Sequence, residues 1–383
     1  MRAEIFIVKK YFLLTILFSI SFCGKVFSQL ENTSLKEIFP VDSTDARWLK
    51  FRISNDVFMK NNEYFGNIAT GYTLFGNMMS PSITFNPNKF LRLQTGVFIR
   101  RDFGNDKFES IIPTMTMKAQ KNGFAVVVGT LEGNVSHHMI QPLFHAERYM
   151  SKHVENGGQF LVNKKRFQSD MWIDWEKMIY PGSQFNEIIT AGLSMNSIVF
   201  NKKHFKIALP MQGIIHHYGG QINSNPFDHI ISIWNRAVGL SLRYENLKGI
   251  FSEIKSENFY VHDRDISPFK QTVVHIGDGY YFNFSFKTKF HFSALASYWN
   301  GLNYYSPLGN PLFQSQSSFD VTFFEPNRHL LLFSFQYEEE ILPNFFVDVR
   351  YEPYFDLLNK LHEYSYSAYF IYRSEFKIFK LKN

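Results

Sequence analysis

The chain has 383 residues, a formal charge of +6 and one cysteine. Cys23 lies in a segment that we expect to be removed, which excludes both a disulfide-stabilised fold and a thiolate metal site. Aromatic residues make up 18% of the chain, including 43 Phe and 20 Tyr, yet the mean hydropathy is only −0.19. A membrane β-barrel reconciles these values, because its apolar residues face lipid while alternate residues face a wet interior.

The N-terminus has the form of a secretory signal. Basic residues, including Arg2 and Lys9, precede an apolar run over residues 11–22, and Ser28 ends a site suited to signal peptidase. The run is too short to span a membrane as a helix. Cleavage removes four basic residues and one acidic residue, so the charge falls from +6 to +3, too low to indicate nucleic-acid binding. The sequence predicts a signal peptide over residues 1–28.

The rest of the chain alternates apolar and polar residues with a period of two, which is typical of β-strands. Residues 91–100 are one example, in which Leu91, Leu93 and Ile99 alternate with Arg92 and Arg100. The same contrast recurs over residues 238–245, 280–287, 345–352 and 364–373. We expect a short N-terminal periplasmic segment over residues 29–46 and an outer-membrane barrel over residues 47–383.

Short and long connectors alternate along the chain, which distinguishes a membrane barrel from a soluble sandwich. Tight connectors are expected at 87–89, 120–122, 163–166, 201–203, 246–248, 287–289 and 326–328, and longer ones near 60–78, 102–107, 132–157, 178–186, 218–235, 261–277 and 301–317. The prediction is an all-β, transmembrane, up-and-down antiparallel β-barrel of about 16 strands. Eighteen strands are the alternative, if residues 376–381 form a strand of their own.

Acidic and basic side chains fall on the face opposite the lipid-facing residues. In the stretch "QSDMWIDWEK", Met171, Ile173 and Trp175 are expected to face lipid, and the acidic residues between them to face the lumen. Such charges could select solutes in a pore. The candidate lumen and selectivity residues are Arg92, Arg100, Asp170, Asp174, Glu176, Arg243, Asp348 and Arg350.

Two motifs are candidates for sites of chemistry. The histidine-rich stretch 137–153 has His138 and His145 seven residues apart, too far for a helical zinc pair. We therefore expect a long loop that folds over or into the barrel, with no metal and no cofactor. His291 and Ser293 would share an inward face rather than meet acyl chains, so they do not suit a lipid hydrolase. We expect the protein not to be an enzyme and to have no catalytic residues.

Four stretches carry a resemblance to a known group of proteins: "FGNMMSPSITFNPNKFLRLQTGVFIRRDFG", "VGTLEGNVSHHMIQPLFHAERY", "MWIDWEKMIY" and "HHYGGQI". They resemble outer-membrane β-barrel, porin-like proteins of Bacteroidota, over residues 60–245. The resemblance implies a barrel in the outer membrane of a Gram-negative cell. It implies no assigned activity and supplies no catalytic residues.

The function expected from these observations is transport, as a porin-like channel for small hydrophilic solutes in the cell outer membrane. Its partners would be outer-membrane lipid and those solutes, and not nucleic acid. Two alternatives remain open: a closed barrel that acts as a surface scaffold or assembly partner, and an outer-membrane hydrolase, which the sequence favours least. A homo-oligomer or an envelope partner protein is also left open.

Overall fold

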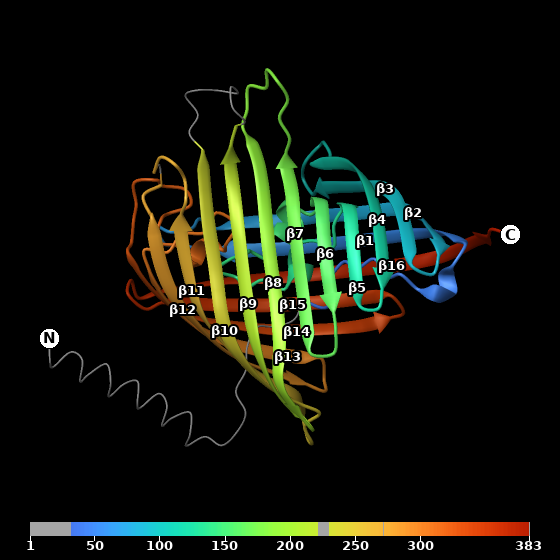
Figure 1. Ribbon diagram of the computed structural model, residues 1–383. Coiled ribbons are helices and arrows are strands. Elements are labelled where there is room, and N and C mark those ends of the chain that lie inside the picture. Colours follow the sequence, from blue (N-terminus) through green and yellow to red (C-terminus); the bar gives the residue numbers. More distant parts are fainter. Residues whose placement is uncertain (1–31, 221–229, 271, 383) are drawn as a thin grey trace.

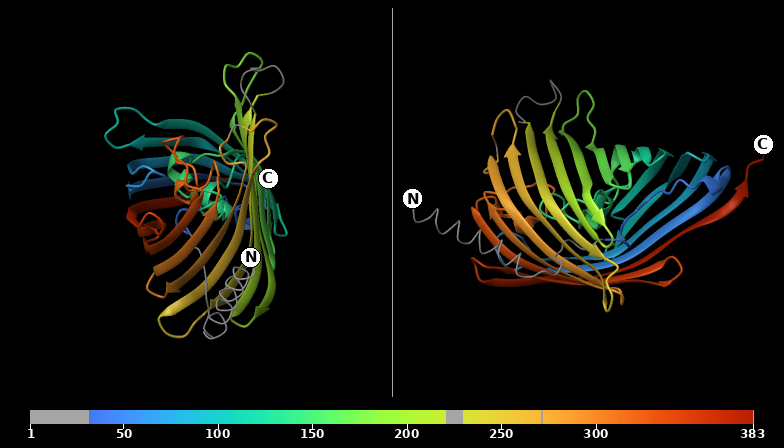
Figure 2. Two further views of the ribbon diagram at one scale, coloured as in Figure 1. Left: turned by 90° about the vertical axis from the view of Figure 1, so that its left-hand side faces the viewer. Right: turned by 60° about the horizontal axis from the view of Figure 1, so that its bottom comes forward.

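The computed structural model describes residues 32–220, 230–270 and 272–382, so the expected signal peptide lies outside the described residues. Sixteen antiparallel strands close into one barrel (Figures 1 and 2). The strands are β1 (Trp48–Glu63), β2 (Tyr72–Asn88), β3 (Leu91–Asp102), β4 (Ser110–Lys121), β5 (Phe124–Thr130), β6 (Asn156–Asn163), β7 (Phe167–Lys177), β8 (Glu187–Lys202), β9 (Phe205–Gly219), β10 (Ile231–Glu245), β11 (Phe251–Asp265), β12 (Ile276–Thr288), β13 (Phe292–Leu302), β14 (Asn327–Leu342), β15 (Phe345–Asp356) and β16 (Leu361–Lys380). The described helices are η1 (Ser43–Asp45), η2 (Asn134–His137), α2 (Arg148–Ser151) and η3 (Pro311–Phe313).

The described part of the chain contains no helix long and apolar enough to cross a bilayer. Each strand pairs with its neighbours in the sequence, and β1 pairs with β16 from Trp48↔Lys380 to Glu63↔Tyr364 to close the barrel. The predicted fold class and strand number are confirmed. Residues 376–381, the basis of the eighteen-strand alternative, include the end of β16 rather than a further strand.

The two ends of the barrel differ in the length of their connections. At one end, short turns join β2 to β3, β4 to β5 and so on to β14 and β15; at the other end, mostly longer loops join β1 to β2, β3 to β4 and so on. The turn at Asn122 and Gly123 has both residues at positive φ, 53° and 76°, as a two-residue hairpin requires. The tight turn predicted at 326–328 is wrong: these residues end the long loop 303–326 and begin β14, and the short turn follows at 343–344.

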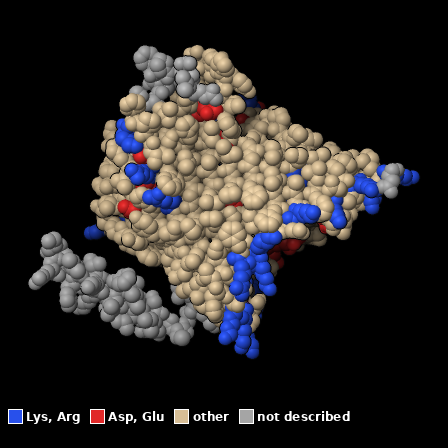
Figure 3. All heavy atoms as spheres, in the orientation of Figure 1, with Lys and Arg blue, Asp and Glu red and all other residues tan. Residues whose placement is uncertain are grey.

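The two faces of the wall have opposite character. On β12, Tyr280, Phe282 and Phe284 point outward and are exposed, whereas Tyr281 and Asn283, between them, are buried inside. Basic side chains gather along the short turns at the bottom of Figure 3, where residues 164–166 and 202–203 lie exposed, while most of the wall above them carries no charge. An apolar wall of this kind matches the lipid-facing band of a membrane barrel.

Three segments fill the interior. The described residues 32–46 of the segment expected to be periplasmic, 29–46, pack inside the barrel, with Leu35 and Phe39 buried. Loops 131–155 and 303–326 fold inward from the opposite end and bond to each other, as where Tyr304 donates to the carbonyl of Pro142 at 2.9 Å. The prediction that the longest histidine-bearing loop enters the barrel is confirmed, although its only α-helix is the single turn α2.

Inward-facing arginines hold the N-terminal segment by its backbone. Arg373 donates to the carbonyls of Ser34 and Lys36, at 2.6 and 2.9 Å. Arg52 donates to Ile38 at 3.3 Å, and Arg92 to Pro40 at 3.2 Å. A segment outside the sheet has carbonyls without ladder partners, and guanidinium groups satisfy them.

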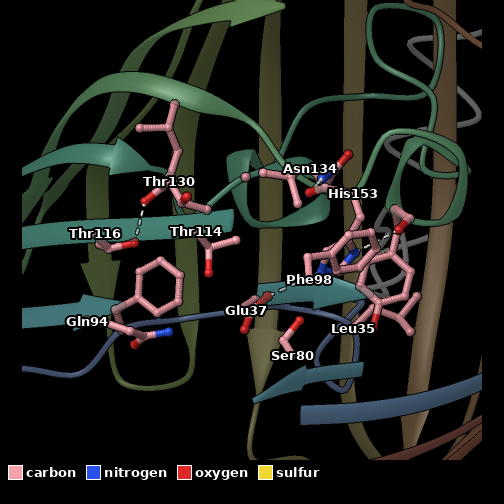
Figure 4. Close-up of a pocket in the computed structure, with 15 residues that line it drawn as sticks. Leu35, Glu37, Ser80, Gln94, Phe98, Thr114, Thr116, Thr130, Asn134 and His153 are labelled. Carbon is pink, nitrogen blue, oxygen red and sulfur yellow. Dashed lines mark hydrogen bonds and ion pairs between the residues drawn. The ribbon is translucent and has the colours of Figure 1, made fainter. Parts of the chain in front are cut away.

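Figure 4 shows where the N-terminal segment meets loop 131–155. His153 stacks on Phe98 of β3 with ring centroids 4.7 Å apart, and its Nε2 lies 3.3 Å from Oε2 of Glu37. The cavity left between them is only about 30 Å³, room for little more than water. This junction is therefore a packing contact between the two inserted segments.

Candidate functional site

A buried histidine fixes the first half of loop 131–155. His137 contacts Asp170 through Nδ1 at 2.8 Å and Glu155 through Nε2 at 2.7 Å. Its ring stacks on Trp172 at 3.6 Å, and Gly192 on β8 makes room for that indole, since a Cβ there would lie 2.1 Å from it. Burial lowers the pKa of His137, but the two carboxylates outweigh it and raise the pKa to about 9. His137 is thus a cation bonded on both sides.

A second buried cluster fixes the other half of the loop. The hydroxyl of Tyr149 donates to the carboxylate of Asp56 on β1. Arg373 on β16 bonds both of them, at 3.1 Å to Asp56 and 2.9 Å to Tyr149. The loop residues between His137 and Tyr149 are therefore held at both ends, close to the inner face of β1.

Between these anchors, His145 and Glu147 form a pair. Nε2 of His145 lies 3.5 Å from Oε1 of Glu147, and the backbone N–H of His145 donates to the carbonyl of Leu308 in the other long loop. The His145 side chain is 15% exposed, and among the described residues none bonds its Nδ1. One nitrogen thus lies at ion-pair distance from a carboxylate, and the described residues provide no partner for the other.

The strand residues opposite complete the cluster by binding Glu147. Lys60 and Asn62, alternate inward residues of β1, approach its Oε1 at 3.3 and 3.0 Å, and Tyr72 of β2 donates to its Oε2. Lys60 also contacts Glu352 on β15 at 2.9 Å. Tyr72 lies at the long-loop end of β2, so the cluster is in the mouth of the barrel.

The environment leaves both loop residues, His145 and Glu147, deprotonated at pH 7. Burial lowers the pKa of His145 and outweighs the nearby Glu147, so the imidazole is neutral at pH 7. Burial raises the pKa of Glu147, but the opposing effect of Lys60 and His145 is larger. The net shift of the pKa is downward, so the carboxylate is ionised at pH 7. A neutral imidazole oriented by a carboxylate is the arrangement of a general base.

The eight residues predicted from the sequence lie on the inner face of the barrel. They belong to four separate strands: Arg92 and Arg100 on β3, Asp170, Asp174 and Glu176 on β7, Arg243 on β10, and Asp348 and Arg350 on β15. Most are engaged: Arg92 contacts Glu375 at 2.6 Å, and Asp348 contacts Arg350. Their role in selecting solutes stays a prediction.

Lys60, Asn62, Tyr72 and the His145–Glu147 pair were not predicted as a site. The sequence holds partial signals, because Lys60 and Asn62 share a strand face and His145 precedes Glu147 by two residues. The contact between loop and strand, however, spans more than 70 residues. Nothing in the described chain groups three or more His, Cys, Asp or Glu side chains as a metal site would require.

Comparisons with known proteins show which family the chain belongs to and which barrels its fold resembles. No curated protein matches the chain. Among solved structures, OprD of Pseudomonas aeruginosa has 8% identity and a TM-score of 0.50, covering 88% of this chain and 99% of that one. OmpT of Vibrio cholerae has 11% identity and a TM-score of 0.49, covering 86% and 100%. At such identities the likeness to OprD shows the fold alone: a barrel of the outer-membrane kind.

The family model for "Lipid A 3'-O-deacylase-type" proteins matches residues 41–381. This corrects the expectation that the chain is not an enzyme, since the family is named for an enzyme activity. The resemblance to porin-like proteins is confirmed for the barrel fold. The resemblance implied a family with no assigned activity, whereas the matched family is named for one. The chain belongs to the lipid A 3'-O-deacylase-type family.

Proposed function

We propose that the protein is an outer-membrane hydrolase that removes an ester-linked acyl chain from a lipid A-type glycolipid. The observation that carries the proposal is the neutral, partly exposed imidazole of His145 beside the carboxylate of Glu147. The family match supplies the class of substrate. The apolar outer wall supports an outer-membrane location, and the long-loop end of such barrels faces the exterior. The site would then lie on the outer-leaflet side.

The proposed reaction is addition of water to the ester carbonyl. His145 takes a proton from water through Nδ1 as the oxygen bonds to the carbonyl carbon. The tetrahedral intermediate collapses with cleavage of the bond to the sugar oxygen, and His145 returns the proton to that oxygen. The products are a fatty acid and a glycolipid with a free hydroxyl. Lys60 and Tyr72 are donors close enough to Glu147 to stabilise negative charge in this region.

The porin-like channel expected from the sequence stays a prediction. The three inserted segments argue against a wide pore, because residues such as Leu35, Leu143 and Phe313 pack in the interior with side chains of the inner wall. Ion conductance of the purified protein in planar bilayers tests it directly.

The hydrolase is tested by incubating the folded protein with lipid A in detergent micelles and measuring fatty acid release. The wild type should release one acyl chain, and His145→Ala should slow release at least ~100-fold, the usual contribution of a general base. The matched control is His275→Ala, a more exposed histidine in another long loop. Wild-type rates from a well-folded His145→Ala protein, or no release by the wild type, would refute the proposal.

A further inference from the structure

The barrel wall has a notch above its two shortest strands. β5 and β6 have 7 and 8 residues, whereas the flanking β4 and β7 have 12 and 11. The β4–β5 ladder ends at Thr116↔Gly129, so residues 110–114 of β4 extend beyond it. The β6–β7 ladder ends at Gly157↔Asp174. Figure 1 shows β5 and β6 stopping short of the tip of β7.

A cavity of about 290 Å³ lies in this notch. Its walls are formed by β3 and β4 on one side, by β7 on the other, and by residues 150–154 of the inserted loop between these strands. Trp175, which lines the cavity from β7, belongs to the outward, lipid-facing set of that strand. The cavity therefore reaches the barrel wall at a strand position whose side chain belongs to the lipid-facing set.

One buried group in this cavity has an unused bonding position. Asp174 is 2% exposed, and its Oδ1 accepts the backbone N–H of Asn156 at 2.8 Å. Its Oδ2 has no hydrogen-bond partner in the described structure. A buried carboxylate oxygen is rarely left unpaired, because it has lost its water without gaining a donor. The missing donor is expected from a bound molecule, which Oδ2 meets once the side chain turns toward the cavity, because this oxygen is itself buried in the unbound structure.

The remaining lining groups indicate the chemistry of that molecule. Lys152, partly exposed, and Glu176 lie 3.3 Å apart and offer a donor and an acceptor, and Trp175 offers an aromatic edge. Hydroxyl groups both donate and accept, so a polyhydroxylated ring suits such a mixed lining. The volume is at the lower end of ligand pockets, roughly 300–1,000 Å³, and fits one ring.

We infer that this notch binds one sugar ring of a glycolipid headgroup that enters sideways from the membrane, with Oδ2 of Asp174 accepting a hydroxyl or amide proton. The choice of a lipid A-type glycolipid rests on the proposed function. Binding of the ring does not depend on catalysis by His145, because the two sites use different residues.

Binding is measured by calorimetric titration of lipid A micelles into the folded His145→Ala protein, so that bound lipid is not hydrolysed. The double variant that also carries Asp174→Asn should bind at least tenfold more weakly, because the substitution replaces one of the two acceptor oxygens by a donor. Adding Asp106→Asn, in the exposed loop beside β4, is the matched control and should leave the affinity unchanged. Micelles with phosphatidylglycerol in place of lipid A should bind at least tenfold more weakly.

Unchanged affinity of a folded Asp174→Asn protein would overturn the inference, as would equal binding of phosphatidylglycerol, which would indicate a phosphate site. These outcomes are independent of hydrolysis. If the wild type released no fatty acid but the Asp174 effect persisted, the proposed reaction would fail and the sugar site would stand.

Discussion

At the scale of residues, the site depends on histidines that have opposite roles in one loop. His137 is a buried cation between two carboxylates and fixes the loop, whereas His145 is neutral and partly exposed. Sequence spacing does not distinguish them. Burial lowers the pKa of both histidines, and only at His137 do two carboxylates, Asp170 of β7 and Glu155, outweigh that effect. This part of the site could not be predicted from the sequence for that reason.

Replacing His137 tests the anchor. His137→Gln should destabilise the packed loop by about 3 kcal/mol, because it leaves Asp170 and Glu155 buried without their cation. The change should appear as faster hydrogen exchange and proteolysis within residues 131–155. His329→Gln, on β14, should leave the loop protected. Equal protection in the wild type and His137→Gln would contradict the anchoring role.

His137 should also make the stability of loop 131–155 depend on pH. The pKa of His137 is raised from 6.5 to about 9 in the folded protein. A raised pKa means that its stabilisation is complete below about pH 6.5 and is lost as the pH rises through about 9. Loop protection, corrected for intrinsic exchange, should therefore fall between these values in the wild type. In His137→Gln this decline should be absent; an identical decline in both proteins would assign it to another group.

At the scale of elements, alternation in the sequence predicted the strands well because each strand has one wet and one lipid-facing side. The exceptions have local causes. Pro326 and Asn327 resemble Pro87 and Asn88, which precede the tight turn at 89–90, so the sequence predicted a tight turn where a long loop ends. The N-terminal segment was expected to be periplasmic because nothing near it in the sequence indicates its contact with Arg373, which binds the carbonyl of Ser34 and is more than 300 residues away.

Removing that segment tests how the interior is filled. Deletion of residues 32–46 takes Leu35 and Phe39 out of the packed interior and frees inward-facing arginines. In planar bilayers the wild type should show little conductance and the deletion variant clearly more. Circular dichroism and heat-modifiable mobility confirm that both are folded barrels. High conductance by the wild type, unchanged by the deletion, would contradict a filled lumen.

At the scale of the whole molecule, the outward aromatic and aliphatic residues define a membrane-embedded wall. Val349→Arg, on the outer face of β15, should cost about 2–4 kcal/mol if that position faces the bilayer core. Phe108→Arg, in an exposed long loop, should cost at most about 1 kcal/mol. Urea titration of both proteins in lipid vesicles measures the difference. Similar costs would contradict the assignment of the outer face.

The most direct test of the central claim is mass spectrometry of lipid A incubated with the wild-type protein in water enriched in oxygen-18. The account predicts a glycolipid lighter by one acyl chain and a free fatty acid that carries one heavy oxygen, because water attacks the ester carbonyl. An unchanged glycolipid in the presence of folded protein would contradict it, as would a label found on the sugar instead of the fatty acid.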